Sequence, residues 1–178
     1  EVQTGLCRTG KMLACDHEGV RPDILVLGKA ISGGMMPVSC VLADNEVMLT
    51  IKPGEHGSTY GGNPIAAKVS MAALEVLVNE KLAENAERIG KIFRDEMKAF
   101  HSPIIEQVRG KGLLNAIQIK PYEGKKAWDL CLAMKEYGLI AKPTHEHTIR
   151  FTPPLVIKEE QMREAIAIIQ KTMADFIK

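Results

Sequence analysis

Several features that would point to particular protein classes are missing from the sequence. Its 23 basic and 22 acidic residues nearly cancel, so the chain has no electrostatic footprint for nucleic acid or for an anionic membrane surface. No apolar run approaches the roughly 18 residues that a membrane-spanning helix needs. The four cysteines lie far apart without a CxxC pair, which argues against a zinc ribbon and a disulfide scaffold and is typical of a reducing compartment. We therefore expect neither nucleic acid nor a membrane as a partner.

What is present is an ordinary globular composition. Over 178 residues, 46% are hydrophobic and 25% are charged, which fits one domain, or one domain and part of another. The chain starts at Glu1 without a methionine or a leader segment, and residues 1–5 resemble the tail of a strand that runs into a glycine turn. We therefore expect part of a longer protein, and a processed chain is the alternative.

The first half of the chain predicts buried strands followed by a buried helix. Residues 23–27 form a continuous apolar run between Pro22 and Gly28, which predicts a strand buried on both faces with parallel neighbours. Residues 37–43 predict the adjacent strand. A loop rich in glycine and proline ends at Asn63, the predicted N-cap of a helix that extends to about residue 80. Because that helix is apolar nearly all round, we expect it to be buried.

The second half changes to an amphipathic pattern, and we place a domain boundary near residue 79. The pattern predicts helices over residues 81–100, over 126–137 with Gly138 as the C-cap, and from about 159 onward. It predicts short strands over residues 113–119, 139–141 and 149–152. The fold class is therefore α/β in the first part and α+β in the second.

Two segments of the first half could carry chemistry. Lys29 follows the predicted strand, so it emerges at the sheet edge where open α/β sheets bind ligands. Partial burial there would lower the pKa of its amine and make it competent to form a Schiff base, whereas an exposed turn lysine is the simpler interpretation. The loop over residues 54–63 places Ser58 and Thr59 among glycines, so that hydroxyls and backbone N–H groups could converge on a phosphate.

The third candidate is Arg150, which alternates with Ile149 and Phe151 in a predicted strand. An arginine in such a place requires a carboxylate, which either a structural ion pair or a substrate could supply. His145 and His147 lack a third ligand nearby, so we expect no metal site.

Together these segments resemble the class III, pyridoxal-phosphate-dependent aminotransferases. The chain begins like the end of that family's D-E-x-Q-x-G-x-x-R-T-G signature. Residues 22–34 resemble the segment of its Schiff-base lysine, and residues 56–64 match the loop that binds phosphate in a second subunit. Within the family, the segments that look most like ornithine aminotransferases are residues 52–60, 108–114 and 149–155.

The resemblance implies pyridoxal 5'-phosphate as the cofactor and a role for each candidate. Lys29 would hold the cofactor as a Schiff base and then act as the base and acid of the proton shift. Gln3 would hydrogen-bond the phenolic oxygen of the cofactor. Ser58 and Thr59 would hold the phosphate of the neighbouring subunit's cofactor, which implies a homodimer with shared active sites. Arg150 would bind a substrate carboxylate.

The resemblance also implies a fold and a reaction. The fold is fold-type I, with residues 1–78 as the C-terminal part of the large cofactor domain and residues 79–178 as the C-terminal small domain. The partners are an amino acid and a 2-oxo acid. The δ-amino group of L-ornithine would pass to 2-oxoglutarate, giving glutamate 5-semialdehyde and glutamate. The compartment stays open between cytoplasm and mitochondrial matrix.

Part of the family's pocket has no counterpart in the sequence. The aspartate that pairs with the pyridine nitrogen would directly precede Glu1, and the aromatic residue that stacks on the ring lies still earlier in the family. We therefore expect this chain alone to be inactive. Two alternatives remain, namely another class III enzyme acting on acetylornithine, 4-aminobutyrate or a diamine, and a non-catalytic fold fragment.

Overall fold

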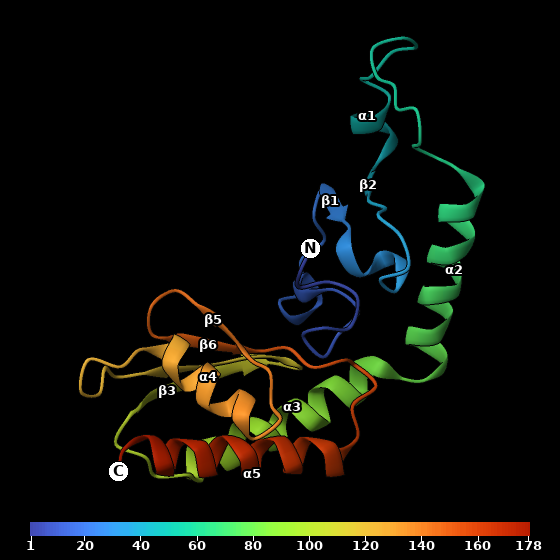
Figure 1. Ribbon diagram of the computed structural model, residues 1–178. Coiled ribbons are helices and arrows are strands. Elements are labelled where there is room, and N and C mark those ends of the chain that lie inside the picture. The colour runs from blue at the N-terminus through green and yellow to red at the C-terminus, as the bar shows by residue number, and fades with distance from the viewer. The chain divides into compact units, whose positions relative to one another are not determined.

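The computed structural model describes residues 1–178 and divides them into two compact units, Glu1–Ala83 and Glu84–Lys178 (Figure 1). The first unit contains η1 (Ala14–His17), β1 (Ile24–Leu27), η2 (Lys29–Ser32), β2 (Cys40–Ala43), α1 (Asn45–Met48) and α2 (Pro64–Asn79). The second contains nearly all of α3 (Leu82–Ala99), then β3 (Ile105–Lys111), β4 (Leu114–Ile119), α4 (Ala127–Glu136), β5 (Lys142–Thr144), β6 (Thr148–Phe151) and α5 (Glu159–Phe176). The mixture of helices and sheets confirms the α/β class. None of the helices has the length and apolar character that crossing a bilayer requires.

The two strands of the first unit pair with each other as predicted, but they do not run parallel. β1 lies beside β2, from Ile24 opposite Ala43 to Leu27 opposite Cys40, and the pair is antiparallel. The predictions of parallel neighbours and of burial on both faces are therefore wrong within this chain. Ile24 is 54% exposed and Val26 42% exposed, because this sheet has two strands and its core gathers around Leu27.

Helix α2 has the predicted extent but not the predicted burial. The Oδ1 atom of Asn63 accepts a hydrogen bond from the Ala66 N–H at 2.8 Å, which confirms the N-cap. Ala66 is the only buried residue of the helix, so the expectation of a helix buried all round is wrong. Leu74 and Leu77 pack against a small cluster of buried residues, whereas Ile65, Met71, Val76 and Val78 are exposed.

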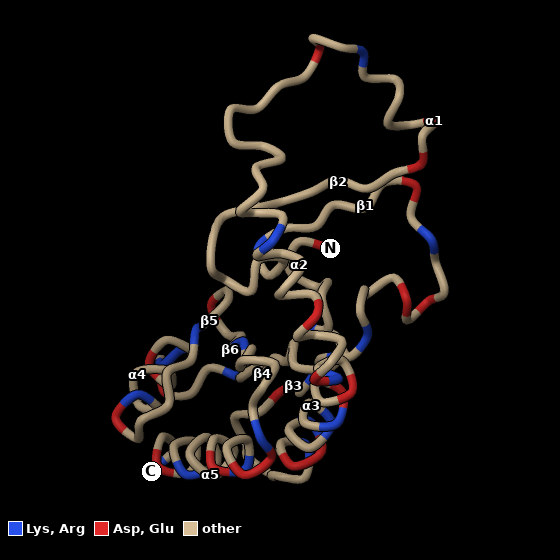
Figure 2. Tube along the Cα trace, turned by 90° about the vertical axis from the view of Figure 1, so that its right-hand side faces the viewer, with Lys and Arg blue, Asp and Glu red and all other residues tan.

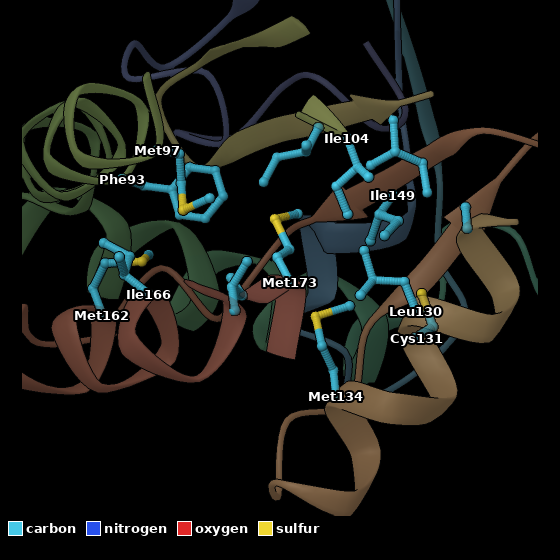
Figure 3. Close-up of a cluster of buried hydrophobic side chains, with 14 of the residues drawn as sticks. Phe93, Met97, Ile104, Leu130, Cys131, Met134, Ile149, Met162, Ile166 and Met173 are labelled. Carbon is cyan, nitrogen blue, oxygen red and sulfur yellow. The ribbon is translucent and has the colours of Figure 1, made fainter. Parts of the chain in front are cut away.

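The second unit is an antiparallel sheet with helices packed on it. The strand order is β3-β4-β6-β5, and Asn115, Ile117 and Ile119 of β4 alternate as buried residues with half-buried ones. One core joins β3, β4 and β6 to α3, α4 and α5, and Figure 3 labels side chains of this core from α3, α4, β6 and α5. The buried stripe of α3 is the predicted one, including Ile89 and Phe93.

Two strand predictions in the second unit need correction. Residues 139–141 are not a strand, because Gly138 ends α4 in a left-handed conformation and the Leu139 N–H bonds back to the Met134 carbonyl at 3.0 Å. Pairing starts only at Lys142, where β5 begins. The strand β3 was not predicted, since its sequence is mostly polar and carries Gly110.

Candidate active site

Lys29 lies directly after β1 and is the first residue of η2. Its backbone is left-handed, with φ near 50°, although it carries a side chain. Such a conformation costs roughly 1 kcal/mol, and strained residues of this kind concentrate at functional sites. The side chain is exposed, which agrees with the simpler of the two interpretations of the sequence, and the alternative of partial burial is not found in this chain.

A hollow of about 800 Å³ brings Lys29 together with the glycine-rich loop. The residues that line it come from three places: the turn after β1, residues 36–39, and residues 58–66 at the start of α2. Ser58 lines this hollow and Thr59 does not, although both are exposed. The structure thus unites, within the first unit, two segments that are far apart in the sequence.

The loop before α2 is folded by its own hydrogen bonds. The Ser58 Oγ accepts the Gly61 N–H at 2.9 Å, which leaves the hydroxyl proton free to donate. The Asn63 Nδ2 donates to the Tyr60 carbonyl at 2.8 Å. Gly61 is required here, because a Cβ atom at this position would lie 2.9 Å from the Cβ of Ser58. An amine and a hydroxyl in one hollow suit a carbonyl compound that also carries an anionic group.

The N-terminal segment lies beside the same turn. A Cβ atom at Gly28 would be 3.6 Å from Cγ1 of Val2, so Val2 packs next to the residue that precedes Lys29. Gln3 follows Val2, is exposed, and does not line the hollow. The structure therefore places Gln3 near Lys29 along the chain path without showing a contact between them.

Hydrogen bonds to Glu1 hold this segment in place. The Glu1 carboxylate accepts the Thr4 hydroxyl at 2.6 Å and the Cys15 N–H at 2.8 Å. Burial alone would raise the pKa of Glu1, but these hydrogen bonds outweigh it and the pKa is lowered. The carboxylate is thereby kept ionised as an anchor for residues 1–5.

Arg150 belongs to the second unit, in β6, and carries no protein counterion. Its neighbours across the sheet are Ala116 of β4 and Lys142 of β5. The Nε atom is buried and has no hydrogen-bond partner, and no carboxylate pairs with the guanidinium. Within this chain, therefore, no carboxylate forms the structural ion pair that was one of the two interpretations open from the sequence. An unpartnered guanidinium nitrogen is instead available to an external acceptor.

Sequence reasoning missed Lys142, which lies directly opposite Arg150. The predicted strand over residues 139–141 stopped one residue short of it. The signal that could have found it is the Gly138 C-cap, since the residues after a left-handed cap complete the helix terminus before a strand can begin.

The model of the class III aminotransferase family matches residues 1–173 of this chain. The mitochondrial ornithine aminotransferase of Rattus norvegicus is 58% identical over 176 residues, which cover 99% of this chain and 40% of that protein. The ornithine aminotransferase of Emericella nidulans is 56% identical over 177 residues, covering 98% of this chain and 39% of that protein. The chain thus spans about 40% of the length of these curated relatives.

Two solved structures are similar over nearly the whole chain. An acetylornithine aminotransferase from Elizabethkingia anophelis has 59% identity and a TM-score of 0.94, covering 99% of this chain and 45% of that one. An ornithine aminotransferase from Toxoplasma gondii, described with partial occupancy of pyridoxal phosphate at its active site, has 47% identity and a TM-score of 0.94. That match covers 98% of this chain and 42% of the Toxoplasma chain.

Proposed function

The chain belongs to the class III aminotransferase family, and we propose that it forms part of an enzyme that moves the δ-amino group of L-ornithine to 2-oxoglutarate. The products would be glutamate 5-semialdehyde and glutamate. The observation that carries the proposal is the exposed Lys29, held by a left-handed backbone beside a hollow, in a chain more than half identical to ornithine aminotransferases. Enzymes of this family use pyridoxal 5'-phosphate, which serves as the electron sink of the reaction.

Lys29 is the proposed catalytic residue. Its exposed amine in the hollow could hold the cofactor covalently through Nζ, and the same nitrogen, once released, would carry the proton from the substrate carbon that bears the amino group to the cofactor carbon that receives that group. The left-handed backbone at Lys29 and the buried Ile31 and Ser32 that follow it hold the start of this side chain in a defined direction. Gln3, two residues after the anchored Glu1, is proposed to hydrogen-bond the phenolic oxygen of the cofactor.

Ser58 and Thr59 are proposed to bind the phosphate of the cofactor held by a neighbouring subunit, so the active sites of a homodimer are shared. The exposure of both hydroxyls leaves them accessible to such a partner. Thr59 lies outside the hollow of its own Lys29, which supports a role at a second site.

Arg150 is proposed to bind a substrate carboxylate with its two-pronged guanidinium. The buried Nε atom without a partner supports this role, because a donor left unpaired in the free protein gains a hydrogen bond when a carboxylate binds.

In the domain organisation of the family, residues 1–78 would be the end of the large cofactor domain and residues 79–178 would be the small domain.

The central test replaces Lys29 in the complete enzyme that carries this chain. Lys29→Ala should leave the fold intact and abolish the half-reaction with ornithine, as well as the absorbance near 420 nm that a lysine-bound cofactor gives. Lys68→Ala is the matched control, because Lys68 is an exposed lysine of α2 that does not line the hollow. Turnover above a trace in Lys29→Ala would end the assignment.

Mixed dimers test the sharing of sites. One subunit would carry Lys29→Ala and the other Thr59→Ala. By itself, the Thr59→Ala substitution should weaken cofactor binding by roughly 1.5–3 kcal/mol, the range for a hydrogen bond to a charged group. If the loop serves the neighbouring subunit, both lesions fall in one site and the other site keeps wild-type cofactor affinity. If no intact site is found, the loop serves its own subunit.

A second candidate function is the transfer from N-acetylornithine, which the 59% identity to the Elizabethkingia enzyme favours. The two donors differ in charge, since acetylation removes the α-ammonium group while the δ-ammonium group stays. Single-turnover rates with L-ornithine and with N-acetyl-L-ornithine separate the two candidates directly. A faster reaction with the acetylated donor would replace the first proposal by the second.

A further inference from the structure

One face of the second unit's sheet carries a row of basic residues. The register places Arg109 of β3 opposite Ala116 of β4, Ala116 opposite Arg150 of β6, and Arg150 opposite Lys142 of β5. Residues directly opposite each other in antiparallel strands point to the same face. Arg109, Arg150 and Lys142 therefore form a line across all four strands, which we name the basic row (the strands are labelled in Figure 2, with basic positions in blue).

The protein itself does not neutralise the basic row. None of its three residues forms an ion pair. The Nη1 atom of Arg109 donates to the amide oxygens of Gln107 at 3.0 Å and Gln118 at 2.9 Å, which are neutral acceptors. Like charges directly across two strands destabilise a sheet, so this arrangement carries a cost that a bound anion would relieve.

Two carboxylates lie near the basic row without pairing with it. Glu106 accepts the Gln118 Nε2 at 2.7 Å, beside the end of the row that Arg109 occupies, and it keeps its negative charge because the amide is neutral. Glu146, in the turn between β5 and β6, pairs with Lys126. Glu106 therefore offsets part of the positive potential at the Arg109 end of the row.

Arg150, at the centre of the basic row, lines two hollows. One has a volume of about 420 Å³ and is lined by both Arg150 and Lys142. The other has a volume of about 430 Å³ and is lined by both Arg150 and Arg109. An anion that approaches Arg150 through either hollow therefore passes a second cation.

We propose that Arg109 and Lys142 are specificity residues that favour the dianionic oxo acid over the cationic amino donor at Arg150. The inference rests on the proposed function, in which Arg150 binds a substrate carboxylate. At neutral pH 2-oxoglutarate carries two negative charges, whereas ornithine carries one net positive charge. The flanking cations attract the first and repel the second through space, without contact with the reacting atoms.

The test measures the two half-reactions separately in the complete holoenzyme. The double variant Arg109→Gln/Lys142→Gln should lower kcat/KM for 2-oxoglutarate about 5–20-fold at low salt, a moderate loss for electrostatic steering. It should leave kcat/KM for ornithine unchanged or raise it about twofold, and kcat should not change. Salt above about 0.3 M should bring the variant and the wild type together for 2-oxoglutarate, because exposed charges are then screened.

Three controls separate charge from structure. Lys98→Gln removes an exposed cation from α3, outside the sheet, and should change neither half-reaction. Arg109→Lys and Lys142→Arg preserve the charge and should retain the discrimination. Equal losses with both substrates, or a loss for 2-oxoglutarate that salt does not reduce, would overturn the proposal. An absence of the ornithine reaction in the wild type would instead refute the proposed function, and the 2-oxoglutarate comparison would still decide the role of the basic row.

Discussion

Among the glycines, Gly90 in the middle of α3 has the least room for a side chain. The helix passes the turn between β3 and β4 so tightly that a Cβ atom at Gly90 would lie 1.6 Å from the carbonyl oxygen of Gly112. Glycine inside a helix usually lowers stability, so Gly→Ala substitutions there usually stabilise a protein by about 1 kcal/mol. Here we predict the opposite sign for Gly90→Ala.

The size of the effect follows from what the Gly112 carbonyl does. It accepts hydrogen bonds from Arg94 Nη1 at 2.8 Å and from Asn115 Nδ2 at 3.1 Å. The turn must move by more than 1 Å to restore an ordinary contact, which breaks or weakens both bonds. Losing them costs about 2–4 kcal/mol, since one donor is charged, and overpacking adds about 1–3 kcal/mol. After the helix gain of about 1 kcal/mol, we expect a net loss of about 2–6 kcal/mol.

Urea unfolding followed by the fluorescence of Trp128, the only tryptophan, measures this loss in the second unit. Lys98→Ala controls for helix propensity alone and should change stability by less than about 0.5 kcal/mol. Gly138→Ala controls for glycine replacement without a clash, because nothing lies within 4 Å of its Cβ position, and its left-handed backbone should cost about 1 kcal/mol. A Gly90→Ala protein as stable as the wild type would refute the close-packing argument.

Three further outcomes are expected. Asn63→Ala should destabilise the first unit by about 1 kcal/mol through loss of the N-cap, and Asn63→Asp should retain most of that stability, both measured by thermal unfolding. Burial raises the pKa of the Cys131 thiol from 9.0 to about 11, so the unfolded chain loses this proton first as pH rises. The stability advantage of the wild type over Cys131→Ala should therefore shrink between pH 9 and pH 11, and a constant difference would contradict the burial argument. Limited proteolysis of the chain by itself should cleave residues 1–83 before residues 84–178, because the first unit has a core of three buried residues and the second has seventeen.

The four longer helices, α2 to α5, could be predicted from the sequence because their determinants are local, whereas the short α1 was not predicted. The caps at Asn63 and Gly138 and the apolar stripe of α3 are set by residues within a few positions of each other. The same holds for β6, where alternation placed Ile149 in the core and Arg150 on the other face. Such local patterns determine these elements regardless of how the rest of the molecule is arranged.

Burial in the first unit could not be predicted, because it depends on what covers an element. The apolar runs of β1 and α2 indicate covering layers on several sides, yet Ile65 is 69% exposed and Val78 is 61% exposed. A sequence records the hydrophobicity of a surface, whereas only the arrangement of the neighbouring elements determines whether that surface meets protein or water. Whether β1 and β2 run parallel or antiparallel also depends on distant parts of the chain, since both directions are compatible with the same apolar run.

The candidate site shows the same division between local and non-local information. Lys29 and the loop of Ser58 each resembled an ordinary turn when taken alone, and their interpretation depended on motifs combined along the whole chain. The basic row could not be predicted by any local pattern, because Arg109 and Lys142 are 33 positions apart and share a face only through the register of β3, β4, β6 and β5. A shift of one residue in any of these pairings would turn one cation away from Arg150. The specificity proposed for this sheet therefore depends on strand register, which in turn depends on packing such as that of Gly90 against Gly112.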